Sequence, residues 1–249
     1  LEMLAKKCGV EITKNTGRKR INKELYEINR LAARYYYRAL REKPNPGLAY
    51  MRNRGLSDDT LNSFGIGYAD DSWTGLTDYL TGEGFNPNDL VEVGLASKKN
   101  GRYFDYFRDR VMFPIQDTSG KVIGFGGRII SDGTPKYLNS KESSVFQKKF
   151  NLYGLNLTRE YAAREDRIFL VEGYMDVISL YQAGVRNVSA SLGTALTEGQ
   201  ARLIKRYTSN VVLSYDADAA GQNAALRGLD ILYGEDCRAR VLVVSDGKD

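Results

Sequence analysis

Apolar residues in the last third of the chain fall into short runs that alternate with amphipathic segments. Short apolar runs are typical of strands buried on both faces, and the apolar residues between them recur at helical spacing. The resulting order, in which strands alternate with helices, predicts an α/β unit with a mostly parallel sheet and helices on both faces. The runs are RIFLVEG (167–173), NVSASLG (187–193), NVVLSY (210–215) and RARVLVV (238–244), and the helices are expected over 175–183, 197–207 and about 219–232.

The middle of the chain has a different pattern. Two β-rich runs, 110–115 and 121–130, flank the turn residues Asp117-Thr118-Ser119-Gly120, and this arrangement predicts an antiparallel hairpin. The segment PKYLNS (135–140) is interpreted as a loop, and residues 156–166 as a helix.

The N-terminal part is predicted to be helical. Apolar residues from Leu25 to Ala39 recur at helical spacing, so we expect a helix over 22–42 with Asn22 as its N-cap. Residues 58–95 indicate short helices joined by glycine-rich turns, one of them beginning at Asn86-Pro87-Asn88-Asp89. We therefore divide the chain into a basic linker (1–20), a mixed helical and antiparallel N-terminal basic subdomain (21–166) and a parallel-sheet domain (167–249).

Composition excludes several classes of site. The 249 residues include no His and two Cys, Cys8 and Cys237, which rules out a Ser-His-Asp triad, a Cys-His dyad, a His-ligated metal and a thiolate zinc site within this chain. No apolar run approaches the roughly 20 residues of a membrane span, so no membrane partner is expected. The chain has no apolar leader and stops just after a strand-like run, which suggests a fragment of a longer protein.

Positive charge is concentrated at the front of the chain. Residues 1–57 hold 14 Lys and Arg against 5 Asp and Glu, whereas the remainder is nearly balanced. A basic front on a nearly neutral body suggests a polyanionic partner such as nucleic acid. The alternative is a solvated helix face, and charge alone does not decide between them.

Acidic residues follow three of the predicted strands. Glu172 comes after IFLV, Asp216 and Asp218 after VVLSY, and Asp246 and Asp249 after VLVV. Parallel strands bring their carboxyl ends to one edge of the sheet, where gathered carboxylates repel one another. A divalent cation relieves that repulsion, and oxygen ligands without His or Cys point to Mg²⁺ or Mn²⁺. The alternative is that the acids are helix N-caps or turn formers.

Eight short motifs carry a resemblance to a known family. Four resemble the TOPRIM domain, and four earlier ones narrow the match to the catalytic core of bacterial DnaG-type DNA primase, which makes short RNA primers on single-stranded DNA. The resemblance implies a TOPRIM-type parallel sheet with flanking helices, truncated at its C-terminal side, behind the mixed N-terminal subdomain. The motifs are RDRVMFPI (108–115), FGGR (125–128), PKYLNS (135–140), LYGL (152–155), VEGYMDV (171–177), SLGTALT (191–197), SYDADAAG (214–221) and DGKD (246–249).

The resemblance assigns eleven residues to the site. A further Asp of the family's metal site would lie beyond the end of this chain, which places full metal occupancy in question. Arg128, Lys136 and Asn139 are assigned to a basic face, although a surface strand residue, a solvated loop charge and an Asx turn are the respective alternatives. The assigned residues are the catalytic metal ligands Glu172, Asp216 and Asp218, the further ligand Asp249, the accessory acids Asp176 and Asp246, and the nucleic-acid or nucleotide contacts Arg128, Lys136, Asn139 and Lys148 or Lys149.

The function that the resemblance implies is DNA-directed RNA synthesis by two-metal nucleotidyl transfer. Its partners would be a single-stranded DNA template, ribonucleoside triphosphates, the RNA primer and, through an absent C-terminal domain, the replicative helicase. The cofactor would be Mg²⁺ or Mn²⁺, with no zinc in this fragment, and the setting would be the replication fork in the bacterial cytoplasm. Two alternatives are a metal-dependent TOPRIM nuclease and a non-catalytic nucleic-acid-binding module whose acids only cap helices.

Overall fold

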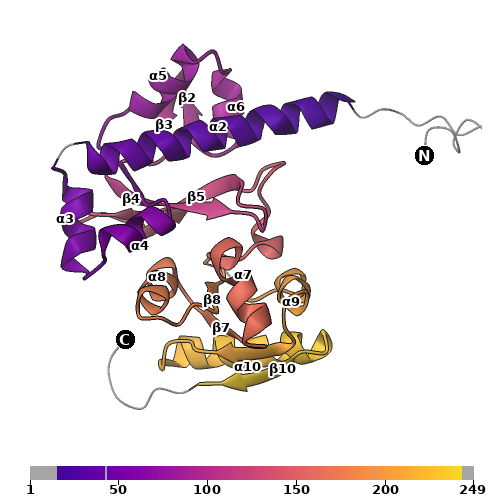
Figure 1. Ribbon diagram of the computed structural model, residues 1–249. Helices are drawn as coiled ribbons and strands as arrows, with labels where there is room; N and C mark the ends of the chain where they lie inside the picture. Colours follow the sequence, from indigo (N-terminus) through magenta and orange to yellow (C-terminus); the bar gives the residue numbers. More distant parts are fainter. Residues whose placement is uncertain (1–15, 43, 194, 243–249) are drawn as a thin grey trace, which may run out of the picture.

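The computed structural model describes residues 16–42, 44–193 and 195–242, and it contains two main sheets that lie one above the other (Figure 1). The first sheet is antiparallel, and the long helix α2 lies across its outer side. The second sheet is parallel, and α7 (Leu155–Arg164) and α10 (Ala219–Gly234) pack against the same face of it. Helix α8 (Tyr174–Gln182) packs against the other face, in the core that the two sheets share.

The antiparallel sheet is built around the predicted hairpin, which is confirmed. Strands β4 and β5 pair across it, and Val111 lies opposite Arg128. The sheet order is β1-β4-β5-β6, so β5, which ends in the FGGR motif, lies between β4 and β6. The strands are β1 (Gly67–Ala69), β4 (Arg110–Gln116), β5 (Val122–Ile129) and β6 (Tyr137–Asn139).

Strand β6 corrects the expected loop over 135–140. Its three residues pair with β5, with Leu138 opposite Gly127 and Asn139 opposite Gly126. The strand is too short to show an alternating pattern, and Gly133 and Pro135 just before it are turn signals. Pairing with the open edge of β5, rather than local propensity, therefore determines its conformation.

Helix α2 (Thr16–Arg41) begins six residues before the predicted start. Asn22 lies inside the helix, so its assignment as N-cap is wrong. Residues 16–20 are helical, and their assignment to a basic linker stays a prediction. The segment 18–20 consists of Arg and Lys, which are good helix formers, so nothing stops the helix there. Within the described residues, no helix is both long and apolar enough to cross a membrane.

Short elements cover the rest of the N-terminal half, as predicted for 58–95. Asn86 caps its helix as expected, because its side chain accepts a hydrogen bond from the backbone N–H of Asn88 at 2.9 Å. Strand β1 and a small hairpin were not predicted. The short elements of this part of the chain are α3 (Pro46–Asn53), α4 (Asp58–Ser63), α5 (Gly75–Gly82), α6 (Pro87–Glu92), the hairpin β2 (Ala96–Lys99) and β3 (Arg102–Asp105), and the 3₁₀ helix η1 (Lys148–Phe150).

The predicted parallel sheet with flanking helices is confirmed. The strand order is β10-β9-β7-β8, and Phe169 of the central strand β7 pairs with Val188 on one side and Val212 on the other. The first and third strands along the chain are therefore neighbours. The elements are α7 (Leu155–Arg164), β7 (Ile168–Val171), α8 (Tyr174–Gln182), β8 (Val188–Ala190), α9 (Glu198–Lys205), β9 (Asn210–Leu213), α10 (Ala219–Gly234) and β10 (Arg238–Val241).

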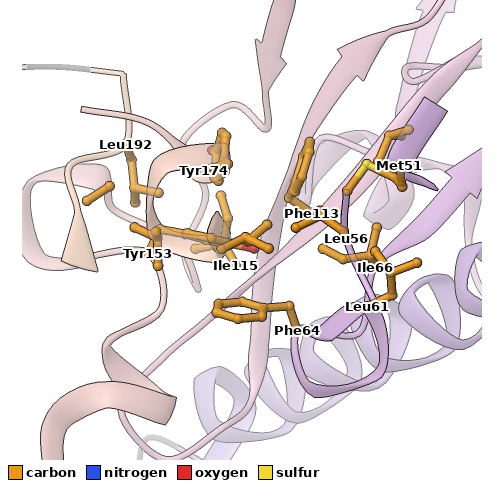
Figure 2. Packing of buried hydrophobic residues seen from close by; sticks show 14 of the residues in the cluster. Met51, Leu56, Leu61, Phe64, Ile66, Phe113, Ile115, Tyr153, Tyr174 and Leu192 are labelled. Atoms are coloured by element: carbon orange, nitrogen blue, oxygen red, sulfur yellow. The ribbon is translucent and has the colours of Figure 1, made fainter. Parts of the chain in front are cut away.

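One hydrophobic core joins the two sheets. Phe113 and Ile115 of β4 lie in the same buried cluster as Tyr153, Tyr174 and Leu192 from the parallel-sheet side (Figure 2). The rings of Phe113 and Tyr174 are stacked with centroids 5.1 Å apart. Burial of this shared apolar surface holds the sheets together, and the boundary predicted at residue 166 stays a prediction.

Candidate active site

Two acidic residues lie next to each other at the carboxyl ends of the two central strands of the parallel sheet. Glu172 follows β7 and Asp216 follows the neighbouring strand β9. The backbone N–H of Asp216 donates a hydrogen bond of 3.1 Å to Oε1 of Glu172. The side chain of Asp216 is exposed, whereas that of Glu172 is partly buried. Strand order alone therefore brings together two acids that lie 44 positions apart in the sequence.

The charge environment of Glu172 extends to two more acids. Burial is the largest influence and raises the pKa of Glu172, and the nearby charges of Asp216, Asp218 and Asp176 raise it further. The bond from the backbone of Asp216 acts in the opposite direction. Three predicted acids thus act on the carboxyl of Glu172 at these strand ends, which are called the acidic edge below.

Two of these acids also hold helix N-termini. Oδ2 of Asp176 accepts a 2.8 Å hydrogen bond from the backbone N–H of Gly173, and Oδ1 of Asp218 accepts one of 2.7 Å from Gly221. Asp218 is the N-cap of α10, whose positive dipole end faces it. The capping alternative therefore describes part of what Asp176 and Asp218 do.

The acidic edge offers oxygen donors, which suit hard cations such as Mg²⁺ and Mn²⁺. Partial burial and mutual repulsion at Glu172 would favour a cation there. Among the described residues, no group of three or more His, Cys, Asp or Glu is arranged closely enough to hold a metal. The predicted acids Asp246 and Asp249 lie outside the described residues. The donor chemistry fits the cation, and Mg²⁺ commonly keeps several waters beside one or two carboxylates.

Arg128 lies between two aromatic rings. Its guanidinium carbon is 4.7 Å from the ring centroid of Tyr50 in α3 and 5.8 Å from that of Tyr137 in β6. One of its terminal nitrogens donates to the carbonyl of Ile129, whereas its buried Nε has no hydrogen-bond partner in the described structure. The rings orient the guanidinium, and because Nε is buried, a phosphate would have to bind at the terminal nitrogens.

Asn139 bridges the two sheets. Its Nδ2 donates to the carbonyl of Leu192 at 3.0 Å, and its Oδ1 accepts from the hydroxyl of Tyr174 at 2.7 Å. Both partners belong to the parallel-sheet side, and Tyr174 lies two residues after Glu172. The structure thus places Asn139 in contacts that connect β6 to the first residue of α8 and to the segment after β8, while its predicted nucleotide contact stays a prediction.

The three candidate lysines differ in the contacts that they make. Lys136 is exposed just before β6, and its carbonyl accepts from the backbone N–H of Ile129 at 3.0 Å. Lys148 and Lys149 lie in η1, which is bonded to the start of α9 through the carbonyls of both lysines. The ammonium of Lys149 is 5.0 Å from the ring centroid of Phe150. These contacts do not favour Lys148 over Lys149, or the reverse, as the predicted nucleic-acid or nucleotide contact.

An exposed aromatic site was not predicted from the sequence. Trp73 is 60% exposed, the guanidinium carbon of Arg108 lies 3.5 Å from its ring centroid, and Phe104 meets it edge-on at 5.7 Å. Arg108 belongs to a quoted motif, but Trp73 is 35 positions earlier, and exposure of an aromatic residue is not visible in the sequence. The side-chain types are those that bind single-stranded nucleic acid.

Family models match both halves of the chain. The model for the DNA primase catalytic core, N-terminal domain, matches residues 35–159, and a Toprim-like model matches residues 169–249. The DNA primase of Clostridium acetobutylicum is 49% identical over 229 residues, which cover 91% of this chain and 38% of that protein. The DNA primase of Deinococcus radiodurans is 44% identical over 252 residues, covering 100% and 43%. The chain therefore spans about two fifths of the length of these relatives.

Solved structures give the same result. The structure of the DnaG primase catalytic domain bound to single-stranded DNA matches with a TM-score of 0.85 and 37% identity, over 94% of this chain and 76% of that one. The Aquifex aeolicus primase, with zinc-binding and RNA polymerase domains, matches with a TM-score of 0.86 and 35% identity, over 99% and 60%. The predicted resemblance is confirmed, and the chain belongs to the family of the DnaG-type DNA primase catalytic core.

Proposed function

We propose that this chain is the RNA-synthesising core of a DNA primase, which makes short RNA primers on single-stranded DNA for replication. The observation that carries the proposal is the junction of two unlike surfaces. The backbone of Asp216 is bonded to Glu172 at the acidic edge, and Tyr174 at the start of α8 is bonded to Asn139 on the strand beside that of Arg128. Joining nucleotides needs carboxylates for a cation and a basic face for phosphates, side by side.

The acidic edge would hold Mg²⁺ or Mn²⁺ by drawing Glu172, Asp216 and Asp218 closer together than they lie in the described structure, with Asp249 as a further ligand. When bound, two such ions would activate the attacking 3′-oxygen and stabilise the leaving pyrophosphate. The protein's own contribution is to collect the carboxylates at fixed strand ends. Asp176 and Asp218 also order the N-termini of α8 and α10, so the acids and the helices behind them are positioned together.

The basic face would bind phosphate. Arg128, with its guanidinium oriented by Tyr50 and Tyr137, is suited to paired hydrogen bonds with phosphate oxygens, and Lys136, Lys148 and Lys149 add point charges. Trp73 with Arg108 offers a separate stacking surface for an unpaired base. Such contacts tolerate any sequence, which suits a template-reading enzyme.

The partners follow from the relatives. One matched catalytic domain is bound to single-stranded DNA, and the RNA polymerase domain of Mycobacterium tuberculosis DnaG is in complex with a double-stranded oligomer that has a 6-nucleotide overhang. For this chain we propose a single-stranded DNA template and ribonucleoside triphosphates as substrates. Contact with the replicative helicase, through sequence outside this chain, and a place at the replication fork in the bacterial cytoplasm belong to the same proposal.

The test is an RNA-synthesis assay with single-stranded DNA, four ribonucleoside triphosphates and Mg²⁺ or Mn²⁺. Template-dependent RNA made by the parent chain and lost in Glu172→Gln supports the proposal. The matched control is Glu198→Gln, because Glu198 is an exposed glutamate on α9 paired with Arg202. Cleavage of the DNA without ribonucleotides would instead identify a nuclease. If DNA binding changed neither with Mg²⁺ nor in Glu172→Gln, and no product formed, the chain would be a binding module.

A further inference from the structure

Helix α8 is bonded to the antiparallel-sheet side at both of its ends. At its first residue, the hydroxyl of Tyr174 donates to Asn139 of β6 at 2.7 Å. The ring of Tyr174 is buried, stacked on Phe113 and edge-on to Tyr153 with centroids 4.6 Å apart (Figure 2). Burial raises the pKa of this hydroxyl, so it stays a neutral donor.

At its last residue, α8 is bonded to the turn between α3 and α4. Nε2 of Gln182 donates to the carbonyl of Gly55 at 2.9 Å, and the backbone N–H of Ser57 donates to Oε1 of Gln182 at 2.8 Å. One amide therefore binds a carbonyl and an N–H of the same turn, more than 120 residues away in the sequence. The turn needs glycine, because Gly55 has a φ of +75°.

These two attachments connect α8 to the elements that carry the basic face. Helix α3, which ends just before Gly55, supplies Tyr50 beside Arg128. Strand β6 supplies Asn139 and follows Lys136. The N-terminus of α8 in turn follows Glu172 directly and includes Asp176. Each end of α8 is thus bonded to an element that positions part of the basic face.

Apolar packing alone does not fix this placement. The shared core holds the two sheets in contact, but the hydrophobic effect has no direction and leaves rotation and sliding to be set by other contacts. Hydrogen bonds at two separated points on one helix restrict both motions. The approach is also close, since a Cβ at Gly126 of β5 would lie 2.5 Å from the ring of Tyr174.

We propose that Tyr174 and Gln182 are positioning residues, which lock α8 to the antiparallel-sheet side and so set the acidic edge against the basic face at the geometry needed for catalysis. The kinetic part of this inference rests on the proposed function, whereas its geometric part does not. Displacement of reacting groups by about 1 Å can lower a rate on the order of a hundredfold, so modest bonds in this place have a large effect on turnover.

The kinetic test compares Tyr174→Phe, Gln182→Ala and the double variant with the parent chain. Tyr161→Phe is the matched control, because it removes one tyrosine hydroxyl, bonded to Arg186, on the parallel-sheet side alone. We expect kcat of the double variant to fall about tenfold, while KM for ribonucleotides and Kd for single-stranded DNA stay within about twofold. Gln182→Glu keeps the acceptor for Ser57 and is expected to restore part of the loss.

The geometric test measures the distance between nitroxide labels at Arg34→Cys on α2 and Arg227→Cys on α10, in a Cys8→Ser background, by pulsed electron spin resonance. Both labelled positions are exposed, and the native Cys237 is buried. We expect one narrow distance distribution in the parent and in Tyr161→Phe, and a broader or shifted one in the double variant.

The two readouts separate the possible failures. A changed distribution together with lower kcat at constant KM supports the proposal. An unchanged distribution overturns it whatever the rate, and so does an unchanged kcat in a variant whose distribution has changed. If the parent chain makes no RNA, the proposed function fails, and the distance distribution alone decides whether Tyr174 and Gln182 lock the helix.

Discussion

The parallel and antiparallel sheets hold their charged side chains in different ways. At the acidic edge, Asp176 and Asp218 are each bonded to a backbone N–H three residues away. On the basic face, Arg128 is oriented by Tyr50 and Tyr137, which come from two other elements. Asp176 and Asp218 are therefore held by local backbone geometry, whereas Arg128 depends on tertiary packing. Substitutions should separate the two arrangements.

Removal of one charge from the acidic edge is expected to have the largest effect. Asp216→Asn should lower kcat by about a hundredfold or more, roughly 2.7 kcal/mol in the barrier, because the proposed cation loses a ligand. Its side chain is exposed, so stability should change by no more than about 0.5 kcal/mol. Steady-state kinetics and urea unfolding measure both, and Asp230→Asn on the same side of the molecule is the control. Full activity in Asp216→Asn would contradict the assigned role.

A second pair of variants compares a helix cap supplied by a residue distant in sequence with a cap supplied by the residue just before the helix. The N-terminus of α5 is capped by Asp105 of β3, which accepts bonds from the N–H groups of Leu76 and Thr77 and from the Thr77 hydroxyl at 2.6–2.9 Å. The carboxylate is buried, and burial raises its pKa despite these donors. Asp105→Ala leaves two buried N–H groups without a partner.

We expect Asp105→Ala to lower the free energy of unfolding by about 2 kcal/mol. Loss of the local cap in Asp218→Ala should cost only about 1 kcal/mol, since the N-terminus of α10 is more exposed to water. Urea unfolding of the two variants tests the difference. Equal costs would show that remote and local caps contribute alike.

The parallel sheet could be predicted because its signals are local. Short apolar runs followed by acids fix both the strands and the positions of Glu172 and Asp216, and parallel pairing then brings the strand ends together. The early start of α2 and the short strand β6 could not be predicted in this way. For the first, Asn22 is a capping residue by type, but the Arg and Lys residues just before it continue the helix. The second is a strand only because β5 offers it an open edge.

The residues of the candidate site also differ in how far the sequence could predict them. Positions after strands identified five of the acids, whereas Asp176, Arg128 and the lysines were identified from the family motifs. The contacts of Asn139 could not be predicted, because its partners Leu192 and Tyr174 lie 53 and 35 positions away. The pairing of Trp73 with Arg108 has the same cause, since it arises only when β3 and the segment before α5 come together.

Substitution of Arg128 tests the role of its two rings. Arg128→Ala should weaken binding of single-stranded DNA or ribonucleotide about tenfold, and Arg128→Lys should not restore it, because an ammonium lacks the planar fork and packs less well between aromatic rings. Fluorescence anisotropy at two salt concentrations measures the affinity. Arg164→Ala, at an exposed arginine of α7 near Glu165, is the control. Recovery by lysine would show that charge alone matters at this position.

The smallest expected effect concerns Trp73, which lies on the antiparallel-sheet side away from the predicted acids. Stacking of one base on an aromatic ring contributes on the order of 1 kcal/mol, so Trp73→Ala should weaken binding of single-stranded DNA about fivefold and leave kcat nearly unchanged at saturating template. Tyr233→Ala is the matched control, because Tyr233 is a similarly exposed aromatic residue, 57% accessible, on the parallel-sheet side. If both substitutions weakened binding equally, DNA contact would not be confined to the basic side of the molecule. If neither did, the Trp73–Arg108 pair would be a structural contact, and template binding would depend on the residues around Arg128.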